Sequence, residues 1–192
     1  MMQKSQKGFT LIEVVIVTAI STIIIAGVFG ILKASNEQLQ TIHAKMSLQE
    51  SLREALFKMA QEIRQTAHHK ILNFGAGNSL SGNTINFSVP VPAPDESTLV
   101  DQNYLPLWAS DINYSLNENT HQIIRTSTDT TTLATKEAVL ANEITALAFS
   151  RSSILSGLIT ITASAQRELA NGKLIPEQPI QLTMQAEARN ST

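Results

Sequence analysis

The chain of 192 residues contains no cysteine, so it can form no disulfide bond and offers no thiolate ligand to a metal ion. It also lacks an excess of positive charge, because 14 Lys and Arg residues stand against 16 Asp and Glu residues. A clustered basic face is the usual footprint of nucleic-acid binding, and this balance gives no support to that function. The length suits one domain plus a membrane helix.

Catalytic motifs are also missing from the sequence. It has no HExxH, GxSxG, Walker A or glycine-rich dinucleotide pattern. The adjacent His68 and His69 point to different faces of a helix, which is poor geometry for a shared metal ion, and His43 and His121 are isolated. We therefore expect no enzymatic activity, no catalytic residue, no metal site and no cofactor.

The sequence does have one long apolar run, from Phe9 to Leu32. At 1.5 Å per residue these residues form about 36 Å of helix, enough to cross a hydrocarbon core of about 30 Å. Lys4 and Lys7 precede the run, so the positive-inside rule places the N-terminus in the cytoplasm. Glu13 is its one charged side chain, and a carboxylate costs about 2.5–3.5 kcal/mol at the centre of an inserted helix.

A secretory signal peptide is the alternative interpretation of this run. It would have a shorter apolar core followed by a cleavage site of small residues. Ala26, Gly27 and Gly30 supply small residues late in the run. Glu13 argues against this alternative, because an early charge weakens such a signal.

The helix is predicted to continue beyond the apolar run, because no proline or glycine occurs from Lys33 to about His69. Apolar residues recur at helical spacing in this segment. They are Leu39, Ile42, Met46, Leu52, Leu56, Met59 and Ile63. A dimeric coiled coil is one interpretation of this stripe, but the stripe is short, so we expect it to dock on a sheet of the same chain.

The pattern changes after Asn73, where glycine and asparagine clusters indicate turns and short strands follow. The predicted strands are 84–91, 112–116, 122–127, 143–151, 158–165 and 179–188. A loop or edge is expected over 126–135, a stiff loop over Pro90–Pro94, and a weak helical patch over Lys136–Leu140. The expected fold class is α+β, a long N-terminal helix packed on an antiparallel β-sheet.

The segment Lys7-Gly8-Phe9-Thr10-Leu11-Ile12-Glu13, with its basic leader and apolar run, resembles the class III signal of type IV prepilins and pseudopilins. This resemblance implies that a prepilin peptidase cleaves after Gly8 and methylates the new N-terminal Phe9. It further implies that Glu13 registers the subunit during assembly, by pairing in the membrane with the amine of an incoming subunit.

Other segments resemble minor pseudopilins of the J type and minor pilins of the W type. They are Met59–Gln65, Ile123–Arg125, Leu140–Ile144, Leu147–Phe149 and Arg189-Asn190. The chain departs from major type IVa pilins, which usually carry a C-terminal cysteine pair. It also has no dense aspartate cluster like the calcium loop of major pseudopilins.

The resemblance implies a leader at residues 1–8, a transmembrane helix at 9–32, an amphipathic stem at 33–70 and a β-rich periplasmic domain at 71–192. The chain would be a single-pass protein of the bacterial inner membrane and a filament component after assembly. Implied partners are other minor and major pseudopilins or pilins, prepilin peptidase and the inner-membrane assembly platform, with no nucleic acid bound directly.

The interpretation that follows is a minor pseudopilin at the filament tip of a type II secretion system. A minor pilin of a type IV pilus or DNA-uptake filament is the first alternative. A membrane-anchored periplasmic binding protein or enzyme is the alternative from another class. Trp108 has two interpretations, a core residue or an aromatic that binds a partner.

Overall fold

The computed structural model describes residues 10–74, 80–90, 107–129, 132–153, 156–168 and 172–188. The chain divides into two compact units, residues 1–43 and 44–192. Helix α1 (Leu11–Gln65) contributes its first part to one unit and its last part to the other. Each unit is described by itself below.

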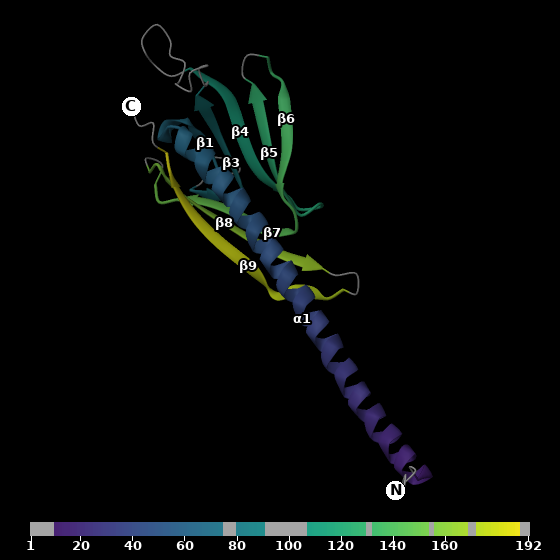
Figure 1. Ribbon diagram of the computed structural model, residues 1–192. Helices are drawn as coiled ribbons and strands as arrows, with labels where there is room; N and C mark the ends of the chain where they lie inside the picture. The colour runs from purple at the N-terminus through teal and green to yellow at the C-terminus, as the bar shows by residue number, and fades with distance from the viewer. Residues whose placement is uncertain are drawn as a thin grey trace, which may run out of the picture. The chain divides into compact units, whose positions relative to one another are not determined.

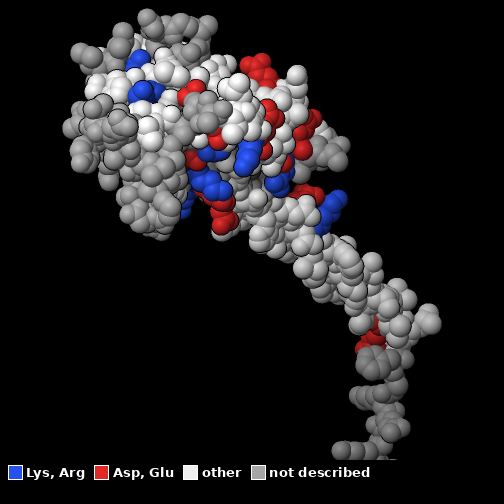
Figure 2. Space-filling view, turned by 90° about the horizontal axis from the view of Figure 1, so that it is seen from above, with Lys and Arg blue, Asp and Glu red and all other residues white. Residues whose placement is uncertain are grey.

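The first unit is the N-terminal part of α1, and its apolar side chains are exposed all round. No residue from Thr10 to Gln40 is buried. Among the described residues, α1 is the one helix whose length and composition suit a membrane span. In Figure 2 this apolar stretch shows little blue or red, and most of the charged side chains lie outside it.

The second unit combines the last turns of α1 and a short 3-10 helix, η1 (His68–Lys70), with two antiparallel sheets (Figure 1). Sheet A has the order β1-β3-β4-β5-β6, formed by Ile71–Asn73, Thr84–Pro90, Trp108–Asn117, Gln122–Asp129 and Thr135–Ala141. Sheet B has the order β2-β7-β8-β9, formed by Ser81–Gly82, Ile144–Arg151, Leu158–Glu168 and Leu174–Glu187. The α+β class is confirmed, with two sheets where one was expected.

One hydrophobic core joins α1 to both sheets. The helix contributes a buried stripe made of Leu48, Leu52, Ala55, Leu56, Met59, Ala60 and Ile63. Phe87 and Tyr114 come from sheet A, and Phe149 and Ile161 come from sheet B. The helix therefore docks on the sheets of its own chain, as the sequence predicted.

The lower part of the predicted stripe is not buried. Leu39, Ile42 and Met46 keep 51%, 52% and 61% of their surface exposed. At 3.6 residues per turn, these positions lie on a different side of the helix from Ala44 and Leu48, which are buried. The predicted stripe therefore combined residues from two faces of the helix. Only the face that carries the later residues, Leu52 to Ile63, belongs to this core.

The weak helical patch expected over Lys136–Leu140 was wrong, because these residues lie in β6. Ala138 pairs with Arg125 of β5, and Glu137 pairs with Thr126. The local propensity of Lys, Glu, Ala and Leu favours a helix, but the ladder with β5 overrides it. The threonine-rich stretch before it is partly strand, since β5 extends to Asp129.

Strand β9 begins five residues earlier than predicted, at Leu174, and passes through Pro176 and Pro179. Proline lacks an N–H group and is tolerated where a strand has no neighbour on one side. Within the part of the chain that the structure describes, β9 is such a strand, because its one neighbour in sheet B is β8. Both prolines are therefore consistent with the place of the strand at the edge of sheet B.

A half-buried carboxylate fastens α1 to sheet A. Tyr114 on β4 donates its hydroxyl to Glu62 Oε2 at 2.6 Å, and Arg125 Nε on β5 donates to both oxygens of Glu62 at 3.0 Å. Burial, then the hydrogen bond and charge of Glu62, raise the pKa of Tyr114 above its ordinary value. Burial alone would lower the pKa of Arg125, but Glu62 raises it.

We expect Arg125→Met to destabilise the second unit by about 1–3 kcal/mol, because Glu62 would keep a half-buried charge without its cation. Urea unfolding of the full chain in detergent, followed by Trp108 fluorescence, measures this. The matched control is Lys58→Met, which removes the exposed pair between Lys58 and Glu54 and should cost less than about 0.5 kcal/mol. Equal losses in the two variants would contradict the fastening role.

Candidate processing and assembly site

The candidate site lies where α1 begins. Gly8 and Phe9, the predicted cleavage and methylation residues, lie outside the described residues. Thr10 is the first described residue, and Glu13 lies in the first turn of α1. The geometry on which the site can be judged is therefore that of Thr10 and Glu13.

Thr10 and Glu13 form a reciprocal capping box. The backbone N–H of Thr10 donates to Glu13 Oε2 at 2.9 Å, and its hydroxyl donates to the same oxygen at 3.0 Å. In return, the backbone N–H of Glu13 lies 3.4 Å from Thr10 Oγ1. Glu13 thus supplies an acceptor for the backbone N–H of Thr10, whereas the N–H of Glu13 also donates to the carbonyl oxygen of Thr10 at 3.1 Å. Sequence reasoning missed this role, although Thr-x-x-Glu is its known signature.

The capping box occupies only one oxygen of Glu13. Both hydrogen bonds from Thr10 go to Oε2, and no other described residue donates to Oε1. The side chain is also exposed along the helix surface. Glu13 can therefore cap its own helix and still present an oxygen to a cation from another chain.

Two threonine side chains of the apolar run are hydrogen-bonded within the helix. Thr18 donates its hydroxyl to the carbonyl oxygens of Val14 and Val15 at 3.0 and 2.9 Å, and Thr22 donates to that of Thr18 at 2.8 Å. Hydroxyls bonded in this way cost little in hydrocarbon. Glu13 is thus the one charged side chain between Leu11 and Leu32.

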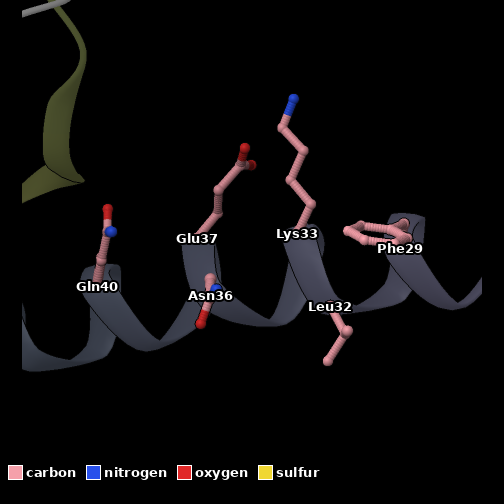
Figure 3. A pocket seen from close by; sticks show the side chains of 6 residues that line it. All are labelled: Phe29, Leu32, Lys33, Asn36, Glu37 and Gln40. Carbon is pink, nitrogen blue, oxygen red and sulfur yellow. The ribbon is translucent and has the colours of Figure 1, made fainter.

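Polar residues mark the upper end of the apolar run. A shallow surface hollow of about 680 Å³ lies along this part of the helix, lined by Phe29, Leu32, Lys33, Asn36, Glu37 and Gln40. Figure 3 shows Lys33, Glu37 and Gln40 projecting to one side of the helix and Leu32 projecting to the other. The change from apolar to charged residues therefore takes place within about two turns.

His68, His69 and Trp108 lie together just beyond the end of α1. The His69 ring lies 6.1 Å from the Trp108 ring, and Lys70 Nζ lies 5.3 Å from the same ring. Burial, and then the charges of Lys70 and His68, lower the pKa of His69. Within the described parts of the chain, no group of three His, Asp or Glu residues is placed to hold a metal ion.

Comparison with known proteins adds one finding about this site. Residues 3–29 match the family model of the prokaryotic N-terminal methylation motif. No curated protein matches the chain. The motif, followed by a long helix packed on antiparallel sheets, indicates the type IV pilin and pseudopilin class. Proteins of this class are structural filament subunits anchored by the apolar helix and processed by prepilin peptidase.

We expect Thr10→Val to loosen the first turn of α1, because it removes the capping hydroxyl while keeping the side-chain shape. The loss of a cap costs about 1 kcal/mol, so the amides of Leu11 to Glu13 should exchange about fivefold faster. Hydrogen exchange on the full chain in detergent measures this. The control, Thr22→Val, also removes a hydroxyl but no cap, and should leave the first turn unchanged.

Proposed function

We propose that the chain is a minor pseudopilin at the filament tip of a type II secretion system. The observation that carries the proposal is the motif match over residues 3–29 together with the geometry of Glu13. The J- and W-type resemblances of the later segments favour a minor subunit over a major one. The lack of cysteine agrees with this choice, because major type IVa pilins usually carry a C-terminal pair.

The proposed mechanism begins with insertion through the apolar run, with Lys4 and Lys7 on the cytoplasmic side. Prepilin peptidase then cleaves after Gly8 and methylates Phe9. Cleavage leaves a positively charged amine on Phe9, next to Thr10. This new charge lies at the same end of the helix as Glu13.

The axial position of each subunit against its neighbour would then be fixed by the cost of an isolated charge in hydrocarbon. An amine and a carboxylate that pair there stabilise each other, whereas each is expensive alone. The amine of an incoming subunit would therefore pair with Glu13 of its neighbour at one axial position. The oxygen Oε1, which Thr10 does not occupy, supplies the acceptor.

The rest of the chain would supply contacts with other subunits. Residues 33–70 form the proposed stem, and residues 71–192 form the proposed periplasmic domain. The partners would be minor and major pseudopilins, after delivery by the inner-membrane assembly platform. The same chemistry suits a minor pilin of a type IV pilus or DNA-uptake filament. Deletion of the gene distinguishes the systems, because it would abolish protein secretion in the first case and twitching or transformation in the second.

The mature N-terminus tests the class directly. We expect mass spectrometry of the full chain, extracted from membranes of a host with its prepilin peptidase, to find N-methylated Phe9 as the first residue. A Gly8→Val variant should retain the leader, because the branched side chain obstructs the peptidase. An intact Met1 in the wild-type chain, or a start beyond Ala26, would favour an ordinary anchor or signal peptide and a periplasmic binding protein or enzyme.

Glu13→Gln separates capping from charge pairing, because glutamine at this position still completes a capping box. We expect normal cleavage but at least about tenfold less incorporation into filaments, since the amine of the neighbour would lack a counter-charge. Quantitative immunoblotting of sheared filaments measures incorporation. The control Glu37→Gln makes the same change beyond the apolar run and should incorporate normally.

A further inference from the structure

The long strand β9 forms one edge of sheet B, with β8 as its one neighbour (Figure 1). The ladder runs without interruption from the pair Leu158 and Glu187 to the pair Ala165 and Ile180. On its other side the strand has no partner strand among the described residues. The direction of its backbone groups can be worked out from this ladder.

The N–H of Ala188 donates to the carbonyl oxygen of Gly157 at 2.9 Å, so the backbone of Ala188 points toward β8. In an antiparallel ladder, the N–H and C=O of one residue point to the same side and alternate along the strand. The residues whose backbone points away from β8 are therefore Gln181, Thr183, Gln185 and Glu187. Their side chains are all exposed as well.

These outward groups receive no hydrogen bond from any described residue outside β9. No charged side chain occurs between Pro179 and Glu187. On the face toward the core, Leu182 and Met184 are only partly buried. The edge thus presents a row of unpaired backbone groups beside an incompletely covered apolar face, which is the template for pairing with another strand.

Strand β6, at the edge of sheet A, provides a comparison within the same chain. The N–H of Asp129 donates to the carbonyl oxygen of Ala134 at 3.0 Å, so the same alternation turns the backbone of Glu137 outward. Lys136 and Glu137 carry exposed charges on this strand. Charged side chains are a common protection of an edge against strand addition. β6 has this protection and the central part of β9 does not.

We propose that the edge of β9 from Gln181 to Glu187 accepts an extended strand from a different filament subunit, which lengthens sheet B by one strand. The choice of a filament subunit as partner rests on the proposed function. Main-chain hydrogen bonds would provide the affinity, and alternate side chains of the added strand would provide the specificity.

A second copy of the chain does not fit this edge in a shared membrane. Two β9 edges can pair antiparallel through a two-fold axis perpendicular to the sheet, which reverses the direction of α1 in one copy. The Ala44–Gln65 part of α1 would then run in opposite directions in the two copies, although both would be anchored through the same N-terminal run. Parallel pairing keeps the direction but turns the apolar faces of the two sheets to opposite sides.

The exposed side chains of β9 define the chemistry of the incoming strand. Its centre should be uncharged, because Gln181, Thr183 and Gln185 offer no counter-charge. On the core side it should carry apolar residues that continue the row of Leu182 and Met184. A basic residue opposite Glu187 would complement the one carboxylate of this edge. The partner is thus an amphipathic strand with a basic end.

Photocrosslinking in the host tests the proposal on the full chain. Benzoyl-phenylalanine replaces Gln185, and the crosslinked peptide is mapped by mass spectrometry in the same cells in which the N-terminus of the chain is determined. We expect a crosslink to an extended segment of a different pilin-like subunit. A crosslink to a second copy, a crosslink within the same chain, or no crosslink above background would each overturn the proposal.

Two proline variants show whether the crosslink depends on the backbone edge. Gln181→Pro removes an outward N–H without breaking a bond to β8, and Glu137→Pro does the same at the edge of β6. We expect about a tenfold drop in crosslink yield for Gln181→Pro, the effect of losing one or two backbone hydrogen bonds, and none for Glu137→Pro. Equal yields in both variants would overturn the proposal.

Circular dichroism of each variant checks folding, and Thr183→Lys replaces Gln181→Pro if the proline variant does not fold. The lysine places a charge on the edge, so it should also lower the crosslink yield. The N-terminus separates the two proposals. Methylated Phe9 without the β9 crosslink refutes strand addition alone, whereas an unprocessed N-terminus with the crosslink refutes the filament role and leaves a strand-binding edge.

Discussion

One continuous helix has to satisfy two different surroundings, and the rest of the structure depends on this constraint. Over its apolar run, α1 exposes hydrophobic side chains on every side, and the hydroxyls of Thr18 and Thr22 donate to carbonyl oxygens of the same helix. From Ala44 onward, one face is buried in a core shared with two sheets. A helix keeps all its backbone hydrogen bonds within the segment, so the same backbone suits hydrocarbon and a protein core. Only the side chains need to change.

Two carboxylates on this helix illustrate how surroundings assign a role. Glu62 is half-buried between Tyr114 and Arg125, where both of its oxygens accept hydrogen bonds and the charge is neutralised within the chain. Glu13 has one oxygen bound by its own cap, and the other has no donor from the described residues. The first carboxylate is complete within the monomer, whereas the second remains available to a cation from outside.

The sequence predicted the features that depend on local pattern. The absence of proline and glycine after Lys33 predicted the long helix, and the spacing of Leu52, Leu56 and Met59 predicted its buried face. The division into two sheets was not predictable from local pattern, because β6 and β7 follow each other closely in sequence and yet lie in different sheets. β6 was missed because its ladder with β5 overrides helical propensity. The capping box was predictable from the Thr10-x-x-Glu13 pattern, but the sequence analysis assigned Glu13 only a role in charge pairing.

The chain leaves two kinds of surface incomplete, and they differ in what they demand of a partner. Leu39, Ile42 and Met46 form an exposed apolar strip on α1. Apolar contact is non-directional, so such a strip accepts any helix of suitable shape. The outward backbone of β9 is directional, because each hydrogen bond fixes the register of the added strand. A subunit that stacks with many neighbours but occupies one place among them needs both kinds of contact. The apolar strip would hold it against any neighbouring helix, and the strand edge would select one specific partner.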